Sequence, residues 1–268
     1  MSRMKELTMH QGIPKGQREY PVDEDILRRD LAAAYRMCAL NGWEDLVANH
    51  LTVRLPQEEG KPESFLINPF GMMFEEITAS SLVKIDVEGN LVDGDDTPIN
   101  KAGFVVHSAI HRTRPDAACV MHVHTDDGVA VSALAEGLLP LNQTAMIIRS
   151  KVAFHDYEGP AVGEAERERM ANHLGNKHMM ILRNHGTMTL GSSVAEAYHR
   201  LHMLEHACTW QVRTLSMGRQ LRYADQAVID DTDLNWGHAD TAYAAYARNI
   251  VWPAILRKLD RTYPDYRD

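Results

Sequence analysis

The sequence predicts an α/β fold, and two observations carry that prediction. Segments with apolar residues at helical spacing alternate along the chain with short runs of apolar and β-branched residues. The composition, 44% hydrophobic and 24% charged over 268 residues, is that of a folded globular chain. Because no repeat or clear linker interrupts the alternation, we expect one domain with a C-terminal extension.

The first expected helix follows the acidic residues 23–25 and ends at Asn41-Gly42. Acidic side chains at a helix start complement the helix dipole, and an Asn-Gly pair is typical of a helix end. Short β-like runs then follow over residues 47–55, 64–69 and, as a hairpin with a Gly-Asn turn, 87–94.

A second helix is expected over residues 103–114, where Pro115 stops it. The next segment, 117–125, alternates in the manner of a strand, so that Val120, His122 and His124 share one face. The alternation continues with a strand at 151–157, a charged helix at 163–174 that Gly175 ends, a strand at 178–184 and a turn at His185-Gly186.

Ser193 and Glu196 have the spacing of a capping box and begin a long helix. Its apolar stripe comprises Val194, Ala197, Leu201, Leu204, Cys208 and Leu215, which we expect to pack on the sheet. Residues 225–237 are polar and acidic, and a last helical stretch near 238–262 contains Pro253, which should bend it.

The net charge limits the kinds of binding partner to expect, and the cysteine content indicates the redox state of the compartment. The balance of 28 basic and 37 acidic residues, −9, argues against nucleic acid or an anionic membrane surface as a partner. Three cysteines, each among apolar neighbours, suit buried thiols in a reducing compartment. The first twenty residues have no apolar signal core, and no uncharged apolar run approaches membrane-spanning length. We therefore expect a cytoplasmic protein.

His122 and His124 are candidate metal ligands because residues i and i+2 of a strand project to the same side. His185, in a turn after another expected strand, is the third candidate, since Gly186 would let the backbone approach a crowded site. The alternative is structural: two histidines satisfying buried backbone groups and one capping a turn. Imidazole ligands suit zinc, with manganese or iron as other candidates.

Two other histidine patterns compete with this trio. The stretch HMLEH at 202–206 matches the H-x-x-E-H pattern of one zinc-peptidase class, but the expected core stripe would turn His202 and His206 away from the core. His107 and His111 are spaced i, i+4, which fits a polar helix face or a supporting role. No G-x-S-x-G, P-loop or G-x-G-x-x-G pattern occurs, so the metal hypothesis leads.

Three stretches resemble the class II aldolase/adducin head-domain family: INKAGFVVHSAIHRTRPDAACVMHVHT, LRNHGTMTLG and EAYHRLHMLEHACTWQVRTL. The resemblance runs from about residue 24 to 218, and its most specific parts are the RPDA…HVHT block and the NHG turn. It implies a three-layer α/β/α fold around a mixed, mostly antiparallel sheet, and zinc held by His122, His124 and His185. It also implies a homotetramer with sites between subunits.

On this basis we divide the chain into an N-terminal arm (1–23), the class II aldolase/adducin-like domain (24–218) and a C-terminal helical extension (219–268) that makes an oligomer contact. Within the domain, the sequence departs from the sugar-phosphate aldolases of the family. Gly103 stands where they carry an acid/base glutamate. Lys101 and Ala102 replace two phosphate-binding serines, and Phe70 replaces a threonine. Asn49 and Gly71 of that substrate pocket are retained.

The first functional hypothesis is therefore a metal-dependent lyase, acting by aldol cleavage or decarboxylation on a small unphosphorylated carbonyl or hydroxy-acid compound. His107, Asp126 and Lys101 are the candidates for proton transfer or for pairing with a substrate carboxylate. The alternative is a non-catalytic binding or scaffold module like the adducin heads. The stretches NKAGF and HVHT resemble the adducin heads more closely than they resemble the sugar aldolases. Actin binding follows only by family analogy, and a metal-dependent oxygenase is a further alternative.

Overall fold

The computed structural model describes residues 23–57, 59–92, 96–159, 164–237 and 240–268. The expected N-terminal arm therefore lies outside the described residues, apart from Asp23. The described residues form one seven-stranded sheet in the order β3-β2-β1-β4-β7-β6-β5. Its strands are β1 (His50–Arg54), β2 (Ser64–Ile67), β3 (Val83–Asp86), β4 (Cys119–Val123), β5 (Val152–His155), β6 (Met179–Leu182) and β7 (Gly186–Gly191).

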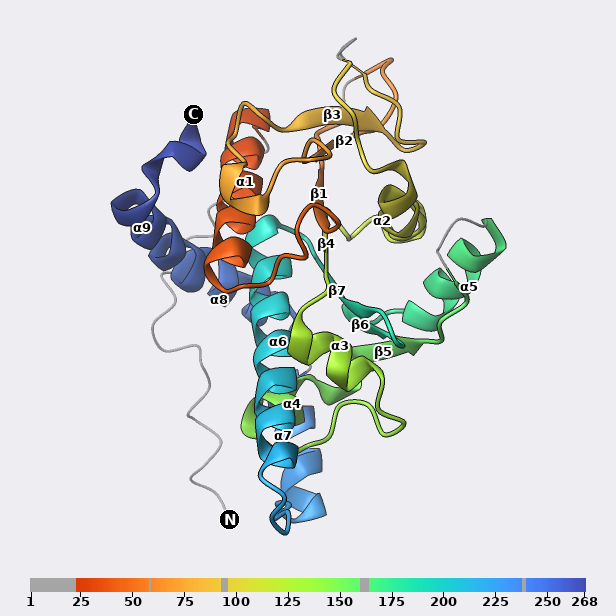
Figure 1. The fold of residues 1–268 in the computed structure, drawn as a ribbon, viewed down its shortest axis with the longest axis vertical. Helices are drawn as coiled ribbons and strands as arrows, with labels where there is room; N and C mark the ends of the chain where they lie inside the picture. The colour runs from red at the N-terminus through yellow and green to blue at the C-terminus, as the bar shows by residue number, and fades with distance from the viewer. Residues whose placement is uncertain (1–22, 58, 93–95, 160–163, 238–239) are drawn as a thin grey trace.

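The sheet is mixed and mostly antiparallel, as expected, because β5 and β6 alone pair in parallel among the described strands. The helices lie on both sides of it, which confirms the three-layer architecture (Figure 1). They are α1 (Glu24–Leu40), α2 (Lys101–Thr113), α3 (Asp126–Ser132), α4 (Gln143–Ile148), α5 (Glu164–Leu174), α6 (Val194–Ser216), α7 (Gln226–Gly237), α8 (Asp240–Tyr246) and α9 (Trp252–Thr262).

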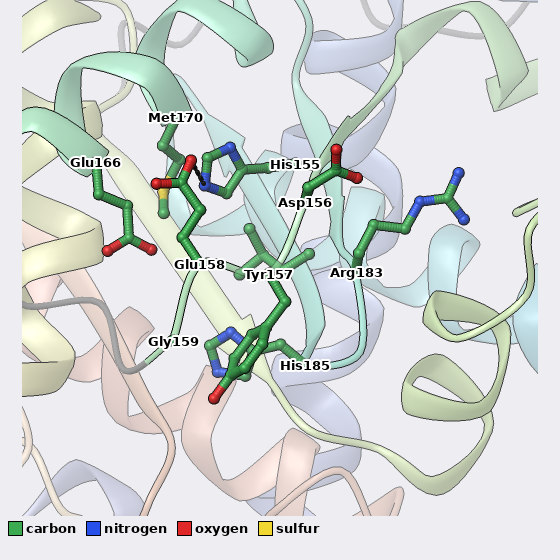
Figure 2. A pocket seen from close by; sticks show the side chains of 10 residues that line it. His155, Asp156, Tyr157, Glu158, Gly159, Glu166, Met170, Arg183 and His185 are labelled. Atoms are coloured by element: carbon green, nitrogen blue, oxygen red, sulfur yellow. Dashed lines mark ion pairs between the residues drawn. The ribbon is translucent and has the colours of Figure 1, made fainter.

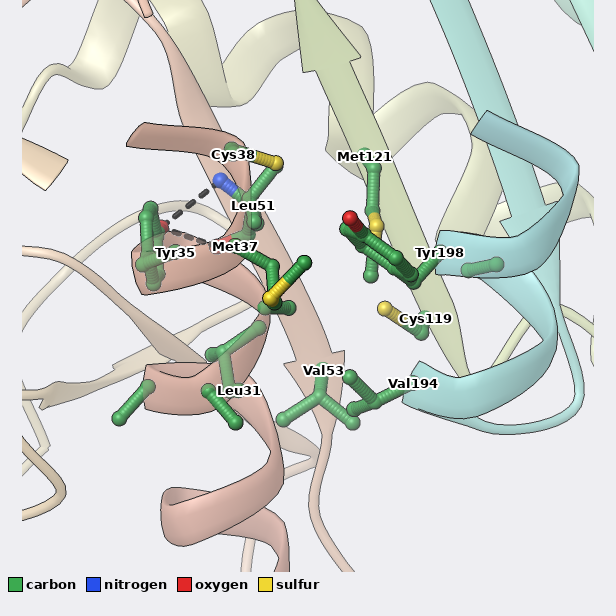
Figure 3. Packing of buried hydrophobic residues seen from close by; sticks show 14 of the residues in the cluster. Leu31, Tyr35, Met37, Cys38, Leu51, Val53, Cys119, Met121, Val194 and Tyr198 are labelled. Carbon is green, nitrogen blue, oxygen red and sulfur yellow. Dashed lines mark hydrogen bonds between the residues drawn. The ribbon is translucent and has the colours of Figure 1, made fainter. Parts of the chain in front are cut away.

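Successive residues of each strand point to opposite faces of the sheet, and the apolar ones on each face pack against a different set of helices. Met121 and its alternate neighbours on β4 pack with α1 and α6 in the main core, while Val120 packs with α2 and α5 on the other face. Figure 3 shows the main core, where Tyr35 lies beside β1 and Tyr198 beside β4. The buried Tyr35 hydroxyl donates to the Leu51 carbonyl over 2.6 Å and accepts from the Leu51 amide over 2.7 Å. The core thus pairs α1 with the sheet without leaving this polar group unsatisfied.

The expected elements are present with shifted ends. The second helix begins at Lys101, two residues earlier than expected, because the Asn100 side chain accepts the Gly103 amide and caps it. The hairpin expected at 87–94 begins earlier in the chain. Its first strand is β3, which ends at Asp86, and Leu91 pairs with Ile85 as an isolated bridge. Residues 93–95 lie outside the described part.

Some elements had not been expected from the sequence. Strand β7 is rich in threonine, and its buried Thr189 hydroxyl donates to the Ala197 carbonyl, so a polar residue is tolerated in a central strand. The polar, acidic segment from 226 to 237 is helix α7, and Arg149 pairs with its Asp230 over 3.0 Å and with its Asp233 over 3.5 Å. Helices α3 and α4 were likewise not expected.

The C-terminal segment passes from α8 through a π-helical turn at Ala247–Val251 into α9, and Pro253 lies in the first turn of α9, where a proline is tolerated. The bend expected at Pro253 stays a prediction. It packs on its own chain: the Trp252 indole donates to the buried Asp30 carboxylate over 2.9 Å, and Arg36 pairs with Asp265 over 2.9 Å. These contacts join α1 to the end of the chain.

Candidate metal centre

Three histidine side chains converge at one end of the central strands. His122 and His124 project from the end of β4, and their Nε2 atoms lie 2.9 Å apart. His185 comes from the turn before β7, and its ring lies 4.8 Å from the His122 ring and 4.7 Å from the His124 ring, centre to centre. Among the described residues this trio forms the one group of His, Cys, Asp and Glu side chains whose spacing could hold a metal ion.

The turn that carries His185 depends on the residue types of Asn184 and Gly186 on either side of it. Asn184 has a left-handed backbone conformation, with φ of +57°, which asparagine adopts more readily than most residues. A Cβ atom on Gly186 would lie 2.5 Å from the Val123 carbonyl oxygen and 3.0 Å from the His124 ring. Only glycine therefore allows β7 to approach β4 here, as the sequence predicted.

Hydrogen bonds orient two of the three rings. His122 Nδ1 donates to the Thr187 carbonyl over 2.9 Å, and His124 Nδ1 donates to the Asp45 carboxylate over 3.0 Å. Both partners are acceptors, so each ring donates its Nδ1 proton to its partner and turns its Nε2 atom toward the other ring. Two lone pairs facing each other at 2.9 Å repel unless a cation or a proton lies between them.

This donor set fits a divalent cation. Zinc–imidazole bonds are about 2.0–2.1 Å long, so two nitrogens 2.9 Å apart can bind the same ion. Burial lowers the pKa of His122 well below its ordinary value, and the neighbouring His124 and His185 lower it further. Burial, together with His124, lowers the pKa of His185 to about 4. Both rings are therefore neutral at physiological pH, which is the metal-binding form.

The loop before β1 supports His124 from outside. The buried Asn49 side chain accepts the Asp45 amide over 2.9 Å and the His124 amide over 3.4 Å, which ties this loop to β4. Its Nδ2 atom is buried and has no hydrogen-bond partner among the described residues. Asn49, a residue predicted to bind substrate, thus offers a free donor next to the histidines.

The family model for the class II aldolase and adducin N-terminal domain matches residues 29–212. The chain belongs to this family. It is 48% identical over 242 residues to the "Putative aldolase class 2 protein" of Caulobacter vibrioides, an alignment that covers 90% of this chain and 91% of that protein. It is also 48% identical over 200 residues to alpha-adducin of Rattus norvegicus, covering 74% of this chain but 27% of that protein.

The fold agrees with this assignment. A crystal structure of an aldolase II superfamily protein from Pseudomonas syringae superposes with a TM-score of 0.85 at 45% identity, over 94% of this chain and 98% of that one. The family usually uses a divalent metal, and the three histidines supply a site for one. Among the described residues, no helix is both long enough and apolar enough to cross a membrane.

His50, which no sequence pattern singled out, occupies the space beside Gly103, the position that the resemblance equates with the glutamate of the family's sugar-phosphate aldolases. Its Nε2 donates to the Gly103 carbonyl over 2.8 Å, and a Cβ on Gly103 would lie 2.5 Å from its ring. Its ring centre lies 4.2 Å from that of His107 and 6.0 Å from that of His122. The one sequence signal for His50 was its place in the strand expected over residues 47–55. In the structure it begins β1 and pairs with His122 on the neighbouring strand β4.

The three candidates for proton transfer lie in different settings. His107 is buried behind His50, its Nδ1 is 2.7 Å from the Thr52 hydroxyl, and its Nε2 has no hydrogen-bond partner among the described residues. Asp126 is exposed at the start of α3, and the exposed Lys101 places its ammonium 3.4 Å from the Asn90 side-chain oxygen. Gly71, the second retained pocket residue, lies in an exposed turn with φ of +99°.

A small pocket adjoins His185. Figure 2 shows the Tyr157 ring in front of His185, and Glu158 and Arg183 also line the pocket. The two rings are 6.4 Å apart, centre to centre. The pocket holds about 10 Å³, which is room for roughly one water molecule. This pocket is therefore too small to hold an organic substrate.

The H-x-x-E-H stretch does not form a peptidase site. His202 is exposed and His206 half-buried on α6, whereas Glu205 between them points the opposite way and is buried. The apolar stripe on this helix is buried from Val194 to Cys208, as expected, and Leu215 is half-buried. The helix thus separates the glutamate from the two histidines, so they cannot share an ion.

Proposed function

We propose that this protein is a metal-dependent carbon–carbon lyase that acts on a small unphosphorylated carbonyl or hydroxy-acid compound. The observation that carries the proposal is that Thr187 and Asp45 orient His122 and His124 with their Nε2 atoms 2.9 Å apart, close enough to bind one cation. His122, His124 and His185 would hold the ion. Zinc is the proposed ion, with Mn²⁺ or Fe²⁺ as alternatives.

When bound, a divalent cation held by these three imidazoles would supply Lewis-acid stabilisation of negative charge on a substrate oxygen. Asn49 Nδ2 is the donor that would orient that substrate, since it is buried and unpaired. The residues that replace the family's phosphate site, Lys101 and Phe70, favour an unphosphorylated compound. Lys101 would pair with a substrate carboxylate.

Proton transfer needs a group other than the family's glutamate. We propose His107 for this step, with His50 between its ring and His122, because His107 Nε2 is free of other partners among the described residues. Asp126, exposed two residues after His124, is the alternative. Aldol cleavage and decarboxylation both leave a carbanion that this proton would quench, so the same residues serve either reaction.

Metal analysis of freshly purified protein tests the proposal. We expect about one metal ion per chain in the wild type, a loss of that ion in His122→Ala, and retention in the control His202→Ala, whose imidazole is exposed on α6. Turnover of a hydroxy acid or hydroxy ketone should disappear with the metal and return when it is added back. Turnover that is unchanged in the metal-free protein would contradict the mechanism.

The second candidate function is a non-catalytic binding module. The observation that favours it is Gly103, because His50 fills the space where its side chain would lie. The chain is also 48% identical to alpha-adducin over 200 residues, the same identity that it has to the bacterial aldolase-class protein over 242 residues. A metabolite screen in which no compound shifts the melting temperature would support this function over the lyase. Binding to actin, and a metal-dependent oxygenase reaction, are lesser alternatives with their own direct assays.

We also propose a cytoplasmic homotetramer in which the C-terminal extension 219–268 makes an oligomer contact, with a small molecule rather than nucleic acid or a membrane as the ligand. Exposed apolar side chains within the extension support the contact: Val228 is 54% exposed and Ile250 is 41% exposed. Light scattering measures the assembly directly, and a stable monomer would contradict it.

A further inference from the structure

Glu205 is a buried carboxylate on the far side of the sheet from the three histidine rings. It extends from α6, is 1% exposed, and accepts hydrogen bonds from the hydroxyl groups of Thr125 and Thr187, one on each oxygen. Burial raises the pKa of Glu205 to about 7. Burying an ionisable carboxylate costs desolvation free energy even when it is hydrogen-bonded, and an apolar side chain of similar volume would often be no less stabilising. The two hydrogen bonds therefore suggest a role in positioning the segments that they join.

The two threonines belong to the two chain segments that carry the metal ligands. Thr125 directly follows His124, and Thr187 lies two residues after His185 and pairs with Val123 across β4 and β7. The Thr187 carbonyl is also the acceptor that orients His122. One carboxylate therefore joins the end of β4 to the start of β7 at the point where all three ligands leave the sheet.

The surroundings of Glu205 are built for this contact. Thr125 Oγ1 also accepts the Gly128 amide over 2.9 Å, so the same hydroxyl caps α3 and donates to the glutamate. A Cβ on Gly128 would lie 2.6 Å from Thr125 Oγ1 and 3.0 Å from the Glu205 carboxylate. Helix α3 can approach the pair only because this residue is glycine.

We propose that Glu205 is a positioning residue: it sets the separation between His122 and His124 on one segment and His185 on the other, and thereby the metal affinity and coordination geometry. The inference rests on the proposed metal centre. Glu205 is the glutamate of the H-x-x-E-H stretch, and this role explains its burial, which a peptidase site does not. Residues that orient metal ligands commonly change metal affinity by about 10- to 100-fold when they are replaced.

The test uses zinc affinity, measured by competition with a chelator, and the visible spectrum of the Co²⁺-substituted protein. We expect Glu205→Met and Thr187→Val to weaken zinc binding by about 10- to 100-fold and to alter the Co²⁺ spectrum. Glu205→Gln should bind zinc within about threefold of the wild type, because its amide can still bond both hydroxyls. Thr187→Val keeps the backbone carbonyl that His122 needs, and it decides the question if Glu205→Met does not fold.

Gln211→Met is the matched control. Gln211 is another buried polar residue of α6, and it bonds the Gly137 carbonyl over 2.8 Å and the Leu139 amide over 2.7 Å, in a loop without metal ligands. It should lower the free energy of unfolding while leaving zinc affinity and the Co²⁺ spectrum unchanged. A merely structural Glu205 would behave in the same way.

The outcomes separate the two proposals. If the wild type binds zinc through His122 but Glu205→Met and Thr187→Val keep wild-type affinity and spectrum, the role of Glu205 is refuted and the metal centre stands. If the wild type and His122→Ala bind zinc equally, the metal centre fails and the role of Glu205 fails with it. Loss of affinity in Gln211→Met as large as that in Glu205→Met would also refute the positioning role.

Discussion

Replacing Gly103 by alanine tests how tightly His50 packs against the position that the resemblance equates with the family's glutamate. The added methyl group would lie 2.5 Å from His50 Cε1, 2.9 Å from His50 Nδ1 and 3.0 Å from Asn100 Nδ2. Contacts this short force neighbouring groups to move, and overpacking of this kind costs about 1–3 kcal/mol. Alanine is favoured over glycine in a helix by up to about 1 kcal/mol, so we expect a net loss of about 1–2 kcal/mol.

The same substitution should have the opposite sign once His50 is gone. In a His50→Val background the main clash is removed, and Gly103→Ala should stabilise the protein by about 0.4–1 kcal/mol through the helix preference alone. The difference between the two backgrounds, about 2 kcal/mol, is the coupling energy of the pair. Restoring the family's glutamate by Gly103→Glu should therefore succeed only when His50 is also replaced by a smaller residue.

Chemical denaturation of the four proteins at one protein concentration measures this coupling. The wild type and His50→Val serve as the two reference states, so the loss of the hydrogen bond from His50 to the Gly103 carbonyl cancels from the comparison. An equal effect of Gly103→Ala in both backgrounds would show that His50 does not fill the glutamate position, and the reasoning would be wrong.

Three further predictions concern the metal support, the C-terminal packing and the core. Asp45→Asn removes the carboxylate that binds His124 Nδ1 and should weaken zinc binding by about 10- to 100-fold in a chelator competition, with the melting temperature of the metal-free protein unchanged. Burial raises the pKa of Asp30 from 3.8 to about 7, so the folded state binds this proton more tightly than the unfolded state. The stability from this group is full below about pH 4 and falls by roughly 4 kcal/mol as the pH rises through 7, a loss that Asp30→Asn should abolish in denaturation curves at several pH values. Leu201→Ala, at a fully buried position of α6, should lower the free energy of unfolding by about 2–5 kcal/mol.

Each of these has a contrary outcome. Zinc affinity that does not change in Asp45→Asn would show that His124 is oriented without the carboxylate. A pH dependence of unfolding that is the same in Asp30→Asn as in the wild type would assign the titration to another group. A loss below about 1 kcal/mol in Leu201→Ala would mean that α6 repacks against the sheet, which the tight main core argues against.

The sequence predicted the fold and the histidine trio because these depend on local patterns. Alternation in the strand at 119–123 placed His122 and His124 on one side, and the Asn-His-Gly turn identified the third residue. Helices with apolar stripes and capping residues, such as the one that begins after Ser193, were also predictable. In these cases the signal lies within a few residues of the feature itself.

The supporting residues could not be predicted because their roles depend on contacts between distant segments. Asp45 reaches His124 across 79 positions, and Glu205 reaches Thr125 across 80. His50 matters because it faces Gly103, which no spacing rule relates to it. Strand β7 was missed because its threonines are satisfied by partners on α6, which an isolated polar strand would not have.

The pairing of β4 with β7 has a kinetic consequence. His124 and His185 are far apart in the sequence, so a cation can bridge them only after these strands have found their register, from Cys119 with Gly191 to Val123 with Thr187. A bound ion then adds stability late, by about 2.7 kcal/mol when its concentration is a hundred times the Kd. Contacts absent from the transition state slow unfolding and leave the folding rate unchanged. Added zinc should thus lengthen the lifetime of the native state, which is what resistance to proteolysis under fast cleavage reports.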